Sequence, residues 1–117
     1  MYKLSRFDIT KSRDIYQRVI DFVNDLKLKL PITTVYLYGS LVQEGEVSEG
    51  SDIDLLIVGD FKDSFFERIL AVMHYTTLPI EPLVYTQNEF DEMKTLKNPL
   101  IMEVLAKGKK IFDRSTG

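Results

Sequence analysis

The chain has 117 residues, of which 44% are hydrophobic and 28% are charged, and its formal net charge is -3. This length and composition predict one domain, residues 1–117, with a single hydrophobic core. The lack of cysteine excludes disulfides, thiol catalysis and cysteine-based zinc sites. The negative net charge argues against a polynucleotide as ligand, because nucleic-acid binding requires a positively charged surface.

Targeting and membrane segments are not predicted. No apolar run approaches the length of a membrane span. Residues 1–6 lack the apolar centre of a secretory signal peptide. We therefore expect a cytoplasmic protein that does not associate with a membrane.

Helical and extended patterns alternate along the chain. Residues 12–30 are predicted to form an amphipathic helix that ends before Pro31, because apolar side chains recur there at helical spacing. The other predicted helices are a short one from residue 41, one over 64–76, one that starts at Thr86, and one over 99–107 closed by Gly108. Strands are predicted over residues 33–38, 52–58, 80–85 and 109–113. This order predicts an α/β (α+β) fold, a small mixed β-sheet with helices packed on one face and the other face open to substrate.

Two carboxylates mark the start of the second predicted strand. Asp52 and Asp54 are two residues apart, so alternation along a strand places both side chains on the same side. Carboxylates this close repel each other and raise each other's pKa unless a cation lies between them. Oxygen ligands at this spacing suit Mg²⁺, which shares its remaining positions with water and phosphate oxygens.

A Gly-Ser pair precedes these carboxylates by a short polar loop. Gly39 and Ser40 follow the first predicted strand, and a helix that starts there would offer backbone N–H groups and a hydroxyl to a phosphate. Each signal has an ordinary structural explanation, since Asp and Gly-Ser are both common in turns. Their joint placement is much rarer and favours a site for phosphoryl or nucleotidyl transfer. Tyr36 and Tyr38 are interpreted as strand residues, with Tyr38 close enough to Gly39 to line that site.

The segment from Gly39-Ser40 to Asp54-Leu55 resembles the signature of the nucleotidyltransferase superfamily with a DNA polymerase β-like fold. It is most similar to the minimal nucleotidyltransferases, the MNT family, whose members consist of the catalytic domain alone. The resemblance implies that Gly39 and Ser40 bind the phosphates of ATP or another nucleoside triphosphate, and we add Ser51 to these nucleotide-binding residues. It also implies that Asp52 and Asp54 hold two Mg²⁺ ions, without a polynucleotide template.

The same resemblance implies a third carboxylate on a later strand, for which Glu81 is the candidate. Glu81 interrupts an apolar run, where a charge is costly unless it is paired or bound to a metal. The alternative is a solvent-facing residue of an edge strand, which Pro79 and Pro82 favour. We assign Asp52, Asp54 and Glu81 as the catalytic and metal-binding residues.

Two features depart from the family pattern. Gln43 stands where many members carry an arginine that contacts phosphate, and the loop also contains Glu44, Glu46 and Glu49. Loss of a charge-assisted contact weakens triphosphate binding. The function expected is a metal-dependent transfer of a nucleoside monophosphate, AMP from ATP, to a hydroxyl. The alternative is a catalytically weak or inactive module that binds nucleotide and masks a partner.

The acceptor is left open by the sequence. The resemblance implies a small helical HEPN-type partner protein, because MNT proteins are often paired with one and some act as antitoxins that transfer AMP to its tyrosine. A toxin–antitoxin role follows from that resemblance alone. Homo-oligomerisation stays open.

Overall fold

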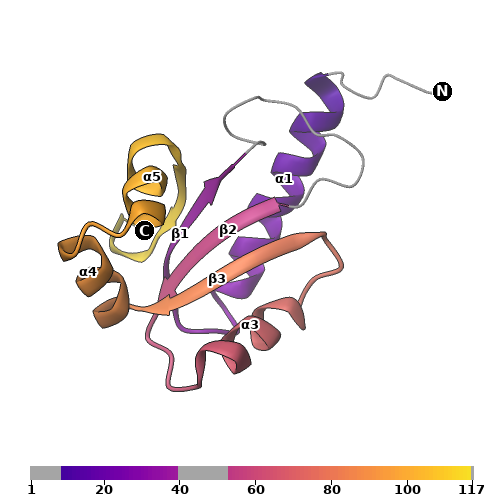
Figure 1. Ribbon diagram of the computed structural model, residues 1–117. Helices are drawn as coiled ribbons and strands as arrows, with labels where there is room; N and C mark the ends of the chain where they lie inside the picture. Colours follow the sequence, from indigo (N-terminus) through magenta and orange to yellow (C-terminus); the bar gives the residue numbers. More distant parts are fainter. Residues whose placement is uncertain (1–8, 40–52, 117) are drawn as a thin grey trace.

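A computed structural model describes residues 9–39 and 53–116 of the chain (Figure 1). The helices are α1 (Ile9–Leu26), α3 (Phe65–Met73), α4 (Gln87–Thr95) and α5 (Pro99–Lys107), and a 3₁₀ turn covers Arg114–Thr116. The strands are β1 (Ile32–Tyr38), β2 (Ile53–Gly59), β3 (Ile80–Thr86) and β4 (Lys109–Asp113). The short helix predicted after Gly39 lies outside the described residues.

The strands form one mixed sheet in the order β3-β2-β1-β4. β1 pairs antiparallel with both β2 and β4, whereas β2 and β3 run parallel. The parallel pair is possible because α3 makes the crossover between them. The predicted class, a small mixed sheet with helices, is confirmed.

One face of the sheet is covered by α1 and α3, as predicted. Alternate residues of the two central strands, Val35 and Leu37 on β1 and Leu55 and Ile57 on β2, are buried in this core. The helices contribute Val19, Phe22, Val23 and Leu26 from α1 and Val72 from α3. Figure 1 shows α1 crossing behind the strands.

The expectation that all helices pack on one face is incomplete, because α4 and α5 lie on the other face. A second core joins Tyr36 of β1 and Leu56 and Val58 of β2 to these helices. The helices supply Phe90, Ile101 and Val104. The physical reason is that β2 is apolar on both sides, and a strand buried on both faces has a continuous apolar run instead of an alternating one.

Hydrogen bonds at the helix ends fix the boundaries of α1 and α4 more closely than the spacing of their apolar residues does. The first helix stops at Leu26 and not at residue 30, because residues 27–30 form a turn in which Lys29 and Leu30 both donate to the Leu26 carbonyl. The predicted start at Thr86 is confirmed by a capping box in which Thr86 and Glu89 exchange hydrogen bonds. No helix in the described part of the chain is long and apolar enough to cross a membrane.

Arg68 ties together three elements at the β3 edge of the sheet. Its guanidinium forms two hydrogen bonds with the Glu89 carboxylate at the start of α4, at 2.8 and 3.2 Å. It also donates to the carbonyls of Val84 on β3 and Asp63 before α3. The Arg68 side chain is 8% exposed and that of Glu89 is 44% exposed. The hydrogen bonds from Arg68, helped by the Thr86 N–H, lower the pKa of the Glu89 carboxyl.

We expect Arg68→Ala to lower the free energy of unfolding by about 2–3 kcal/mol, because it removes the donor of the buried Val84 carbonyl and two hydrogen bonds to the Glu89 carboxylate. Arg18→Ala is the matched control, since Arg18 forms an exposed i,i+4 pair with Asp14. That control should change stability by about 0.5 kcal/mol or less. Urea unfolding of both variants measures the difference, and equal losses would contradict a structural role for Arg68.

Candidate active site

Three polar side chains form a row across the end of the sheet. Tyr38 of β1 is the register partner of Asp54 on β2, and Asp54 is the register partner of Glu81 on β3. Directly opposed residues of neighbouring strands project to the same face. The structure therefore places Asp54 and Glu81 side by side on one face, together with the Tyr38 phenol.

Gly39 closes this row from the end of β1. Its φ is +86°, in the region that favours glycine. A Cβ at this position would collide with Oδ2 of Asp54 and would lie 3.2 Å from its Cγ. The Asp54 carboxylate thus fills the space that a side chain at residue 39 would need, so the chain requires glycine here for two independent reasons.

Tyr38 lies in the field of both carboxylates. Burial, followed by the charge of Asp54, raises the pKa of the Tyr38 phenol to about 12, and Tyr85 and Glu81 act in the same direction. The phenol therefore remains a protonated hydrogen-bond donor at neutral pH. We interpreted Tyr38 from the sequence as a strand residue next to the site, and the structure brings it into the row itself.

The two carboxylates differ in exposure. Asp54 is half-buried, whereas Glu81 is exposed on β3, which is an edge strand as Pro79 and Pro82 suggested. The Ile53 N–H donates to the Pro79 carbonyl. Alternation along a parallel ladder then turns the Glu81 N–H toward β2 and the Pro82 nitrogen away from β2. Pro82 consequently costs no ladder hydrogen bond and leaves the register of Glu81 intact.

The remaining predicted site residues, Ser40, Ser51 and Asp52, lie outside the described residues, as does Gln43. Among the residues that the structure describes, no group of three or more potential metal ligands is present. Asp54 and Glu81 supply two carboxylates to the row. Their oxygens are the ligand type that Mg²⁺ selects, so the donors present fit a magnesium ion.

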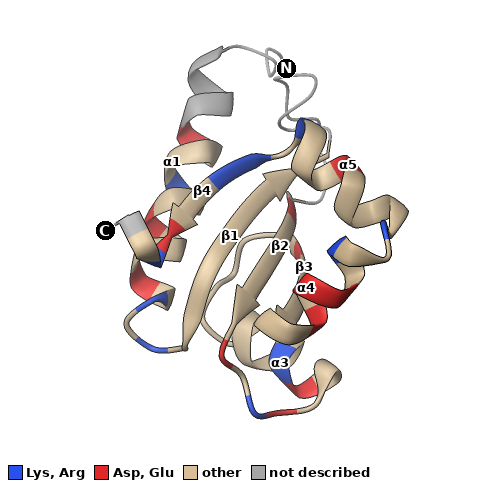
Figure 2. Cartoon of the chain, turned by 90° about the vertical axis from the view of Figure 1, so that its left-hand side faces the viewer, with Lys and Arg blue, Asp and Glu red and all other residues tan. Residues whose placement is uncertain are grey.

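The sequence analysis assigned no role to Lys110. This residue of β4 is the register partner of Tyr36, its Nζ lies 5.9 Å from the centre of the Tyr36 ring, and it forms an ion pair with Asp113 at 3.1 Å. Tyr36 and Tyr38 are two residues apart on β1, so Lys110 lies on the face that carries the row. Figure 2 shows the basic segment of β4 and the acidic positions of α4 at opposite margins of the sheet. A lysine in a short C-terminal strand carries no local signal of this placement.

A mixed sheet that presents paired carboxylates beside a glycine turn fits a nucleotidyltransferase-type domain. The family model "Polymerase beta, Nucleotidyltransferase" matches residues 17–117. The chain therefore belongs to the polymerase beta nucleotidyltransferase family.

A solved structure supports the fold. The chain is similar to a "putative nucleotidyltransferase" from Sulfolobus solfataricus, with a TM-score of 0.67 and 20% identity over 93% of this chain and 89% of that one. At this level of identity the likeness concerns the fold alone. No curated protein matches the chain.

We expect Gly39→Ala to destabilise the protein by about 1–3 kcal/mol, from the unfavourable positive φ and from the collision with Asp54. The same substitution in an Asp54→Ala background separates the two causes, because the truncated side chain no longer reaches Cβ. The cost should be smaller in that background, as measured by denaturant unfolding. An equal cost in both backgrounds would show that Asp54 does not pack against Gly39.

The Tyr38 phenol should titrate near pH 12 in the folded protein, and Asp54→Asn should lower its pKa while leaving it above 10.0. Because the folded pKa is raised, the stabilisation is fully present below about pH 10 and is lost as the pH rises toward 12. Ultraviolet difference titration against Tyr38→Phe isolates this group. Asp60→Asn, on an exposed residue after β2, is the control and should leave the Tyr38 pKa unchanged.

Proposed function

We propose that the protein is a metal-dependent nucleotidyltransferase that transfers a nucleoside monophosphate, AMP from ATP, to a hydroxyl of an acceptor. The observation that carries this proposal is the register that pairs Asp54 with Glu81 on one face, against the side-chain-free Gly39. A row of carboxylates beside a glycine turn offers metal ligands next to a place where a phosphate can approach the backbone closely. Membership of the family supports the same assignment.

Asp54 and Glu81 would hold the metal, with Asp52 as a further ligand from the residue two positions before Asp54. A bound pair of Mg²⁺ ions would offset the charge of the phosphates and of the oxygens that attack and leave phosphorus. Gly39 and Ser40 would bind the β and γ phosphates, with Ser51 at the end of the intervening loop. The absence of a side chain at Gly39 leaves its backbone accessible to a phosphate oxygen.

Glu81 would receive the acceptor proton, and its exposure on β3 supports this role. The acceptor oxygen would form a bond to the α phosphorus while the bond to the bridging oxygen breaks, and pyrophosphate would leave. The proton of the acceptor hydroxyl would pass to the Glu81 carboxylate. The protonated Tyr38 phenol would donate a hydrogen bond within the row and orient the Asp54 carboxylate.

We propose that the acceptor comes from another molecule, because the described residues form one sheet with its helices. We propose a protein partner of the small helical HEPN type in a cytoplasmic toxin–antitoxin pair, as in the related MNT proteins. The substitution of Gln43 for the expected arginine favours a second candidate, a module that binds the partner with little turnover.

We expect Asp54→Asn to eliminate transfer of labelled AMP from ATP and to remove the stabilisation of the fold by Mg²⁺, because one carboxylate ligand is lost. Asp60→Asn carries the same chemical change on an exposed residue outside the row and should behave as the unmodified chain. Thermal unfolding with and without Mg²⁺, and covalent labelling of the co-expressed genomic neighbour, provide the two measurements.

The two candidate functions give opposite results in cells. If transfer is the function, Asp54→Asn should fail to protect against a toxic partner although it still binds that partner. Full protection by Asp54→Asn would contradict transfer and favour the masking module. Identical melting of both variants with and without metal would contradict the metal site.

A further inference from the structure

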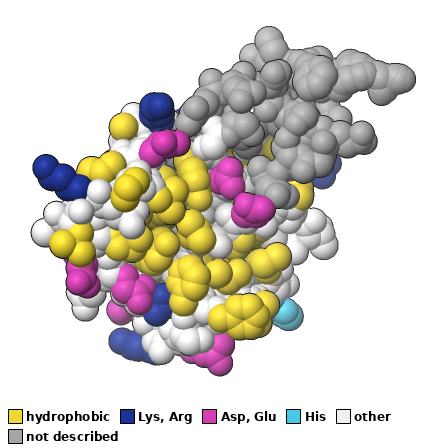
Figure 3. Space-filling view, in the orientation of Figure 1, with side chains coloured by type: hydrophobic (Ala, Val, Ile, Leu, Met, Phe, Trp, Pro, Cys, Tyr) yellow, Lys and Arg dark blue, Asp and Glu magenta, His cyan; other side chains and the backbone are white. Residues whose placement is uncertain are grey.

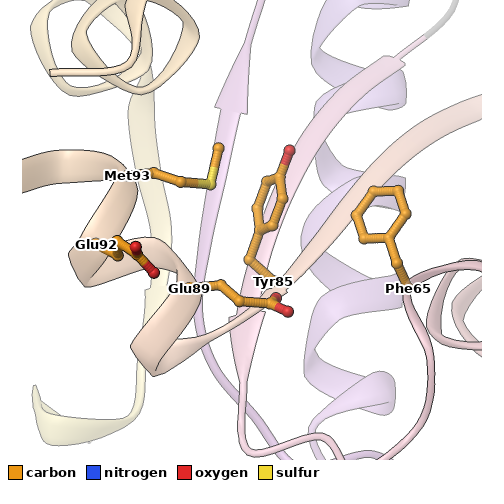
Figure 4. A pocket seen from close by; sticks show the side chains of 5 residues that line it. All are labelled: Phe65, Tyr85, Glu89, Glu92 and Met93. Carbon is orange, nitrogen blue, oxygen red and sulfur yellow. The ribbon is translucent and has the colours of Figure 1, made fainter. Parts of the chain in front are cut away.

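A small hollow lies on the sheet face beyond the carboxylate row. Its volume is about 290 Å³, and it is lined by Phe65, Tyr85, Glu89, Glu92 and Met93. Figure 4 shows the Tyr85 ring standing between the Met93 side chain and the Phe65 ring, with both glutamates on the α4 side. This volume lies just below the range of ligand pockets, which are typically about 300–1,000 Å³. The hollow therefore suits one side-chain-sized group and not a whole nucleotide.

The walls of the hollow favour a positively charged group. Phe65 and Tyr85 lie 5.5 Å apart between ring centres, tilted by 32°, and present aromatic surface to it. The faces of aromatic rings attract cations, and methionine sulfur adapts to apolar stems. An ammonium or guanidinium on a short apolar stem would find partners for both of its parts there.

The carboxylates determine which charge a ligand of the hollow should carry. Glu89 is already paired with Arg68, so its charge is offset inside the protein. Glu92 is exposed, and within residues 9–39 and 53–116 no ion pair is found for it. The Glu92 carboxylate is therefore available to pair with a cation in the hollow. The aromatic pair and the methionine thioether would partly shield that cation from water.

The hollow and the carboxylate row share one strip of the sheet. Glu81, Leu83 and Tyr85 alternate along β3 and project to the same face. Four residues along a strand span about 13 Å, which is the separation of Tyr85 from Glu81 along β3. Through the register of Asp54, Tyr38 lies at the Glu81 end of this strip. In Figure 3 hydrophobic side chains form a band across the face on which β3 lies in front.

We propose that this hollow anchors the acceptor through a positively charged group, an ammonium or guanidinium on an apolar stem. The acceptor hydroxyl would then lie at Glu81, roughly 13 Å from the anchored cation. The assignment of the ligand as the acceptor rests on the proposed transferase function. The assignment of the hollow to an organic cation rests on its own lining.

The test uses the full chain with labelled methionine methyl groups and tyrosine rings, followed by NMR. Benzamidine is the probe, and benzamide is its uncharged control of nearly the same shape. Benzamidine should shift the Met93 and Tyr85 signals saturably, and benzamide should bind at least tenfold more weakly. Glu92→Gln should weaken benzamidine binding roughly threefold to tenfold. Glu103→Gln, which removes an exposed carboxylate from α5, should leave binding unchanged.

Phe65→Ala is a second variant, because it removes an aromatic wall that is 40% exposed and is not required for the core. It should also weaken benzamidine binding without lowering the melting temperature by more than a few degrees. Equal binding of benzamide and benzamidine, or no effect of Glu92→Gln in a folded protein, would overturn the proposal.

Two further experiments distinguish a protein acceptor from a small amine, and the cation site from the transferase function. A blocked Gly-Arg-Gly peptide that shifts the same signals as benzamidine indicates an arginine of a protein acceptor, and binding of benzamidine alone indicates a small amine. Titration with ATP and Mg²⁺ reports on the row independently, through the Tyr38 ring. Benzamidine binding without nucleotide binding would support the cation site in the hollow and contradict the transferase function. Nucleotide binding without benzamidine binding would contradict the cation site alone.

Discussion

The register of β2 against its two neighbours is the constraint on which the site depends. β2 pairs antiparallel with β1 and parallel with β3, so one strand fixes the positions of Tyr38, Asp54 and Glu81 together. A slip of β3 by one residue would turn Glu81 toward the core that holds Ile53 and Val84. An unpaired carboxylate in that core would cost several kcal/mol. Packing of the opposite face therefore selects the geometry of the carboxylates.

The helices hold this register from both sides. α1 and α3 bury one face of β2, α4 and α5 bury part of the other, and Arg68 connects α3 to the start of α4 around the β3 edge. Its bond to the Val84 carbonyl also occupies an outward-facing acceptor of the edge strand, and Pro82 removes an outward-facing donor. An edge protected in this way is a poor template for another strand.

Much of this arrangement could be predicted from local patterns. Alternation and spacing gave the strands, and the capping residues Thr86 and Glu89 gave the start of α4. The second packed face was missed, although the continuous apolar run of β2 was its signal. The role of Arg68 had no signal in the sequence, because an arginine in an amphipathic helix is ordinarily solvated. Its partner, Glu89, is 21 residues away. Phe65, Tyr85 and Glu92 meet only after α3, β3 and α4 are assembled, so no spacing in the chain announces the hollow.

The charge of the site strip explains why metal, nucleotide and acceptor would depend on one another. Three carboxylates, those of Asp54, Glu81 and Glu92, lie along the described part of the strip, and Lys110 forms an ion pair with Asp113. A free triphosphate is repelled by such a surface, whereas a divalent cation and an organic cation are attracted to it. The proposed nucleotide would therefore bind together with its metal ions, which would reverse the local field. A cationic acceptor would fit the same field, and its hydroxyl would lie at Glu81, the residue proposed to take its proton.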